Sequence, residues 1–169
     1  MKKKNSGNKI KQNIIKCKKY KSSKKILFYV GYSHPEYRWN KTTSLTTPTG
    51  GSEKALSYLI EKFPKNYDIY VCGDVIEEEC GNIHFINSSK IKNIVEENEF
   101  NTVILSRYIE FIVNHAFKCY KLYVWAHDTC IRSLSEKNND ANKIIKCCID
   151  KIDGCICLTN WHKEYFSKQ

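Results

Sequence analysis

Six short apolar runs alternate with segments of helical periodicity along most of this chain, and this alternation restricts the possible folds. Each run is four to six residues long, as is typical of strands buried on both faces of a sheet. The runs expected to form strands are 26–30, 68–73, 83–86, 102–106, 122–126 and 155–158. Helices are expected over about 52–62, 90–98, 109–117 and 140–151, with a last helix from Trp161. Strands that alternate with helices predict an α/β fold with a Rossmann-like, doubly wound parallel sheet in three layers.

The last of these helices has a candidate capping residue and two large side chains at its start. Thr159 or Asn160 is expected to cap the helix, because a side-chain oxygen there can accept a backbone N–H bond. We expect Trp161 to pack on the sheet and His162 to face solvent.

Positive charge is concentrated in residues 1–25, which hold eleven lysines and no acidic residue. The rest of the chain then carries a formal charge of −1. A segment rich in lysine, asparagine and serine buries too little apolar surface to fold, so we expect residues 1–25 to form a disordered tail. Residues 26–169 are expected to form one globular domain.

The lysine-rich tail could bind nucleic acid, anionic lipid or an acidic partner. Its lack of arginine and its single aromatic residue, Tyr20, argue against a role in stacking on bases. The first lysines are not followed by the apolar core of a signal peptide. No later segment approaches the ~18 consecutive apolar residues that a membrane span needs, so we expect no span.

Nine cysteines are present, and their number and spacing bear on metal and redox chemistry. The odd count and the absence of a C-x-x-C pair argue against a disulfide framework and against a zinc site. A reducing compartment fits best, so we expect a cytoplasmic protein. The sequence also has no D-x-D pair to hold a divalent ion, and metal-independent chemistry is expected.

Two glycines, Gly50 and Gly51, stand directly before an amphipathic run. A helix that begins there presents unpaired backbone N–H groups with no Cβ in front of them, and its dipole favours an anion. In the alternative interpretation the glycines only end a loop, and Ser52 is the N-cap. The apolar residues that recur at helical spacing are Ala55, Leu56, Leu59, Ile60 and Phe63.

Polar residues follow several of the expected strands. In a doubly wound sheet the ligand binds outside the carboxyl ends of the strands, where these residues would meet. An imidazole beside a carboxylate, as in His127 and Asp128, can work in acid–base chemistry or orient a substrate hydroxyl. Alternatively, His127 bonds to backbone and Asp128 begins a turn. The residues expected at this edge are Gly31, Gly73, Asp74, Ser106, Arg107, His127, Asp128, Thr159 and Asn160.

Common enzyme signatures are absent from the sequence. It contains no G-x-G-x-x-G, no G-x-x-x-x-G-K-[ST], no G-x-S-x-G and no H-E-x-x-H. These absences argue against a dinucleotide-binding fingerprint, a P-loop, an α/β-hydrolase elbow and a zinc protease.

Taken together, four segments in this order resemble the N-terminal domain of GT-B-fold glycosyltransferases of the large retaining group that uses nucleotide sugars. The resemblance covers about residues 26–169. The segments are the strand at 26–30, the Gly-Gly turn at 50–56, the strand end at 124–128 and the segment at 157–166.

This resemblance implies roles for particular residues. Gly50, Gly51 and Ser52 would lie against the donor diphosphate, and His127 would be the catalytic residue that approaches the donor sugar. No cofactor is implied, because the nucleotide sugar is a substrate. An acceptor, a sugar or another hydroxyl compound, would bind the loop between Gly31 and Thr49. The implied acceptor-binding residues are Tyr37, Arg38, Trp39 and Asp128, although Trp39 could equally be packed under the loop.

The sequence departs from that family in its length. In the family a second Rossmann-like domain binds most of the nucleotide, and this sequence stops at Gln169, where that domain would follow. We therefore expect the acceptor-side half of a glycosyltransferase, with a separate C-terminal half as a possible partner. One alternative is a non-catalytic sugar- or nucleotide-binding relic or split subunit of such an enzyme. Another is a nucleic-acid-binding domain with a basic tail.

Overall fold

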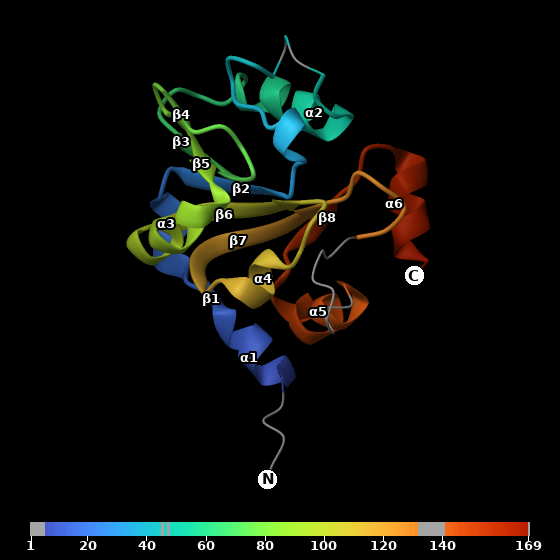
Figure 1. Cartoon of the computed structure of the whole chain (residues 1–169). Helices are drawn as coiled ribbons and strands as arrows, with labels where there is room; N and C mark the ends of the chain where they lie inside the picture. The colour runs from blue at the N-terminus through green and yellow to red at the C-terminus, as the bar shows by residue number, and fades with distance from the viewer. Residues whose placement is uncertain (1–5, 45, 47, 132–140, 169) are drawn as a thin grey trace.

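The computed structural model describes residues 6–44, 46, 48–131 and 141–168, and in this part of the chain eight strands form one sheet (Figure 1). The strands are β1 (Ile14–Lys16), β2 (Lys25–Gly31), β3 (Asp68–Gly73), β4 (Glu78–Cys80), β5 (Ile83–Asn87), β6 (Glu99–Ser106), β7 (Phe117–Trp125) and β8 (Gly154–Ile156). The α-helices are α1 (Ser6–Asn13), α2 (Gly51–Ile60), α3 (Ile91–Glu97), α4 (Phe111–Asn114), α5 (Ala141–Cys148) and α6 (Asn160–Ser167). Short 3-10 helices are η1 (Lys18–Ser22), η2 (Pro35–Tyr37), η3 (Ser88–Lys90) and η4 (Ile149–Lys151).

The sheet is parallel except for β4, which runs antiparallel to β5. The order across it is β1-β7-β6-β2-β3-β5-β4, and β8 also pairs with β7. Taken in chain order from β2, the six predicted strands therefore have the spatial order 3-2-1-4-5-6 of doubly wound sheets. The prediction of a largely parallel α/β sheet is confirmed. The short strands β1 and β4 are additional to it, and β4 stands where a helix would usually connect β3 to β5.

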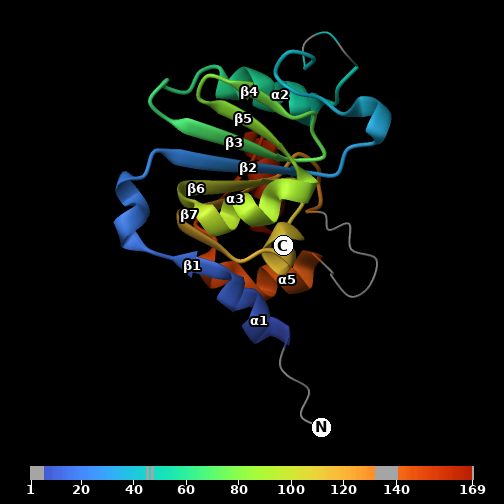
Figure 2. The ribbon, with the colours of Figure 1, turned by 60° about the vertical axis from the view of Figure 1, so that its left-hand side comes forward.

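Buried side chains on both faces of the sheet explain why its central strand, β2, is apolar along almost its whole length. In β2, Leu27 and Tyr29 face a core shared with α1, α3, α4 and α5, whereas Ile26, Phe28 and Val30 face a core shared with α2. This alternation follows from the two-residue period of a strand. Accordingly, α2 lies on the opposite side of β2 from α3 and α4 (Figures 1 and 2).

The N-terminal segment is part of this domain, so the prediction of a disordered tail is wrong for residues 6–25; residues 1–5 lie outside the described residues. Strand β1 pairs with β7 in parallel, with Ile14 opposite Phe117. Ile14 is fully buried in the core, and Ile10 of α1 packs against the same core. A few isoleucines at the right spacing therefore anchor a segment whose overall composition is typical of disorder.

Strands β1 and β8 pair with different stretches of β7, Phe117–Cys119 and Tyr123–Trp125, and Asp153 bonds to the backbone of Leu122 between them. The Leu122 N–H donates to Asp153 Oδ2 (2.8 Å), and the Asp153 N–H donates to the Leu122 carbonyl (2.8 Å). The carboxylate also forms ion pairs with Lys16 of β1 and with Lys121 of β7. Burial alone would raise the pKa of Asp153, but hydrogen bonds from Lys16, Lys121 and the Leu122 N–H outweigh it and lower the pKa.

The helix predicted over 109–117 is shorter than expected. Only Phe111–Asn114 form an α-helix, α4, and Phe117 begins β7. Phe117 packs its ring against that of Phe111, with centroids 5.0 Å apart, and is buried. The apolar residues in this region therefore belong to two elements that face the same core, which mimics the period of one longer helix.

Candidate functional site

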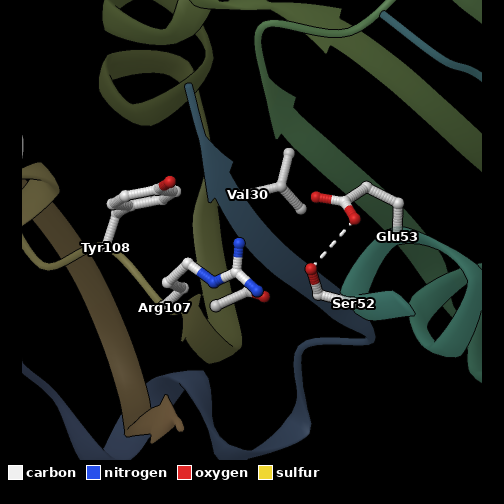
Figure 3. Close-up of a pocket in the computed structure, with 6 residues that line it drawn as sticks. Val30, Ser52, Glu53, Arg107 and Tyr108 are labelled. Atoms are coloured by element: carbon white, nitrogen blue, oxygen red, sulfur yellow. Dashed lines mark hydrogen bonds between the residues drawn. The ribbon is translucent and has the colours of Figure 1, made fainter. Parts of the chain in front are cut away.

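The carboxyl ends of β2 and β6 meet the start of α2 at a shallow recess, which lies where the strand order reverses (Figure 3). Such reversals are where doubly wound sheets bind their ligands. The recess encloses no volume that a water molecule could occupy, so a ligand would have to lie across its mouth. Its lining residues are Val30, Ser52, Glu53, Ser106, Arg107 and Tyr108.

His127 lies beside this recess and is fixed by two contacts. Its Nε2 is 2.9 Å from the Ser106 hydroxyl oxygen, and its ring packs on Trp125 with centroids 4.6 Å apart. Burial, together with the nearby Arg107 charge, lowers the pKa of His127, against a smaller opposing effect of Glu53. The imidazole is therefore neutral near pH 7 and can offer a hydrogen bond to a ligand. The sequence predicted both Ser106 and His127 at this edge, but not that they touch.

Arg107 has a left-handed backbone, with φ of 69°, which a residue with a side chain rarely adopts. Its N–H donates to the Trp125 carbonyl (3.0 Å), and its Nε pairs with Asp128 Oδ2 (3.1 Å). Asp128, implied to bind an acceptor, is therefore engaged with Arg107. The sequence placed Arg107 at this edge without a role; its position directly after a strand was the available signal.

His162 and Trp161 are placed opposite to expectation. His162 is buried; its Nδ1 accepts from the Leu158 N–H (3.3 Å), and its Nε2 lies 2.8 Å from the Asp128 carbonyl, to which it donates. Trp161 is 62% exposed. The predicted cap at Thr159 is confirmed, since its hydroxyl accepts the His162 N–H, and this cap fixes which side of α6 turns inward. His162 thereby ties α6 to the backbone that carries Asp128.

The Gly-Gly turn begins α2 as predicted, with Gly50 as the N-cap and Gly51 as the first helical residue. Ser52 lies inside the helix, so the alternative in which Ser52 is the N-cap is wrong. Its hydroxyl donates to Glu53 Oε2 (2.9 Å), and a Cβ on Gly50 would stand 2.3 Å from that same oxygen. A Cβ on Gly51 would meet nothing within 4 Å. The start of α2 is thus open in front of Gly51, while the Glu53 carboxylate covers Gly50.

The loop that was expected to bind an acceptor divides into exposed and buried residues. Tyr37 and Arg38 are exposed, and neither lines the recess. Trp39 is fully buried and packs edge-on against Phe85, with ring centroids 5.3 Å apart. The prediction that Trp39 faces an acceptor is therefore wrong, because the indole fills the core between this loop and the sheet.

Two expectations concern features that the sequence lacks. Within the described residues, no three His, Cys, Asp or Glu side chains form a group that could hold a metal ion. None of the helices in that part of the chain combines the length and the apolarity that crossing a bilayer requires. Independence from metals and a cytoplasmic location stay predictions.

Comparison with known proteins adds no family to this description. No protein-family model matches the chain, and no curated protein or solved structure matches it. The fold and the site by themselves define an α/β domain with the doubly wound strand order and a polar cluster where that order reverses.

Proposed function

We propose that this chain is the acceptor-side half of a GT-B-type glycosyltransferase, which moves a sugar from a nucleotide diphosphate donor to an acceptor hydroxyl. The observation that carries the proposal is the position of His127. It is held by Ser106 beside the start of α2, where a doubly wound sheet binds its ligand. The order of the motifs along the sequence supports the same assignment.

The transfer would break the bond between the sugar's anomeric carbon and a phosphate oxygen of the donor and form one to the acceptor oxygen, whose proton passes to the departing diphosphate. Negative charge then builds up on the departing diphosphate, and donors fixed in advance stabilise it most. The start of α2 would supply such donors, namely the backbone N–H groups of Gly50, Gly51 and Ser52. The Nδ1 atom of His127 makes no hydrogen bond within the described residues, so it would be available to orient a hydroxyl of the sugar.

Substituting His127 tests the proposal through sugar recognition. Titration calorimetry of the purified chain with a panel of nucleotide sugars should show weak binding, tighter for one nucleotide sugar than for its nucleoside diphosphate. His127→Ala should abolish that preference, about a tenfold effect for one lost polar contact, and leave the diphosphate affinity unchanged. His84→Ala, which removes a histidine that stacks on Tyr70, is the matched control. Equal wild-type affinity for both ligands would contradict a sugar-binding role for His127.

One feature of the site favours the alternative of a non-catalytic sugar-binding relic or split subunit. The Glu53 carboxylate at the start of α2 would accept hydrogen bonds from sugar hydroxyls but repel a phosphate. Glu53→Gln separates the two functions. For a donor-binding half-enzyme we expect the affinity for the nucleoside diphosphate to rise about tenfold, because one repulsive charge is removed. A fall in affinity for the free sugar, with no change for the diphosphate, would support the relic.

A further inference from the structure

One ion pair, from its Nε to Asp128, anchors the Arg107 side chain at the mouth of the recess. Its backbone is fixed in the left-handed region by the hydrogen bond to Trp125, and its Nε is fixed by Asp128. Asp128 is in turn held through its carbonyl by His162 of α6. An unfavourable backbone conformation persists only where its surroundings enforce it, and here they aim a guanidinium group.

The two terminal nitrogens of that guanidinium are left open. Within the described residues they donate no hydrogen bond, and the recorded contact with Asp128 is through Nε; the Arg107 side chain is 27% exposed. In Figure 3 the Arg107 guanidinium points across the recess toward Ser52, which belongs to α2. A planar guanidinium with a fixed orientation and two open N–H donors matches the geometry of a phosphate or carboxylate.

We infer that Arg107 binds a phosphate group of the donor through its terminal nitrogens, with Asp128 as the residue that positions it. This inference rests on the proposed function, which supplies the diphosphate. The bound phosphate lies across the mouth of the recess, between Arg107 and the open start of α2 at Gly51. Asp128 is engaged at Nε, so it orients the guanidinium without occupying the nitrogens that face the ligand.

Titration calorimetry with inorganic pyrophosphate and with the nucleotide sugar that binds best tests the role of Arg107. Arg107→Gln should lower both affinities by about 10- to 100-fold, since a charge-assisted bidentate contact is lost. Arg107→Lys, which keeps the charge but not the fork, should fall between it and wild type. Lys118→Gln removes one charge at the amino end of β7, away from the carboxyl strand ends that form the recess, and should change affinity by less than about twofold, because distant charges are screened. Circular dichroism establishes that each variant is folded.

The outcomes separate this inference from the proposed function. If wild type binds and both folded Arg107 variants bind equally well, the inference is wrong and the proposed function survives. If wild type binds neither pyrophosphate nor any nucleotide sugar at millimolar concentration, both are wrong. If only Arg107→Lys folds, a lower affinity than wild type supports the inference, and an equal affinity contradicts it.

A double-mutant cycle tests Asp128 as a positioning residue. Asp128→Asn should weaken pyrophosphate binding in the wild-type background and have little further effect beside Arg107→Gln, because its influence acts through Arg107. A merely structural role for Asp128 would weaken binding equally in both backgrounds, and that result would overturn its assignment.

Discussion

Ile14→Ala should destabilise the protein by about 2–5 kcal/mol, although the residue stands in a segment dominated by lysines. Ile14 is fully buried against β7, and truncation would leave a cavity at the edge of the core. The neighbouring Ile15 is 44% exposed, so Ile15→Ala is a matched control that should cost less than about 1 kcal/mol. Urea unfolding of the two variants measures both values.

Deletion of residues 1–24 extends this test. It removes α1 and β1 together with the hydrogen bonds from the Asn13 amide to the Ile112 and Val113 carbonyls. We expect the deletion to cost more than Ile14→Ala, and in a marginally stable domain this is enough to populate the unfolded state. A deletion variant as stable as the full chain would show that the N-terminal elements contribute nothing.

Asp153→Ala should cost about 2–3 kcal/mol, because it leaves the Leu122 N–H without its acceptor and two lysines without their carboxylate. The matched control is Asp150→Ala, since Asp150 is exposed and forms a surface pair with Lys11 worth about 0.5 kcal/mol or less. Thermal or urea unfolding at neutral pH compares the two variants. Equal losses would show that the contacts of Asp153 on β7 add no stability.

The contribution of Asp153 should also depend on pH in a defined direction. Its pKa is lowered in the folded protein, so the stabilisation is fully present above the unfolded carboxyl pKa of about 3.9. It is lost as the pH falls through the folded value. Asp153→Asn should therefore differ from wild type at neutral pH, and the difference should shrink progressively below pH ~4. A constant difference down to strongly acidic pH would contradict the ion pairs.

The central strand β2 could be predicted because it is a run of apolar residues buried on both faces, whereas the predicted strand β8 is short and largely exposed. The N-terminal segment could not be predicted, because β1 is only three residues long. The amino-acid composition of the segment is dominated by lysine and does not show that Ile14 pairs with Phe117. A short strand whose partner lies far along the chain leaves no periodic signal. What stabilises it is tertiary contact, which local sequence does not contain.

The sequence predicts that the candidate site lies at the carboxyl ends of the strands, but it does not predict which side chains there contact one another. Strand ends locate Ser106, Arg107 and His127 near one another, since parallel strands end at one edge of the sheet. Which of them touch depends on side-chain directions, and the role of Arg107 depends on a left-handed backbone that no sequence pattern marks. The inward-facing side of α6 could not be predicted for a similar reason: hydrophobicity favours burying Trp161, whereas hydrogen bonds bury His162.

The pairing of β1 with β7 orders events during synthesis of the protein. Ile14 leaves the ribosome early, but Phe117 and the strand that receives Ile14 follow only about a hundred residues later. Contacts so distant in sequence form late in folding. Ile14 therefore stays without its partner strand until β7 has been synthesised. Until then, repulsion between the lysines of residues 1–25 opposes association of such incomplete chains.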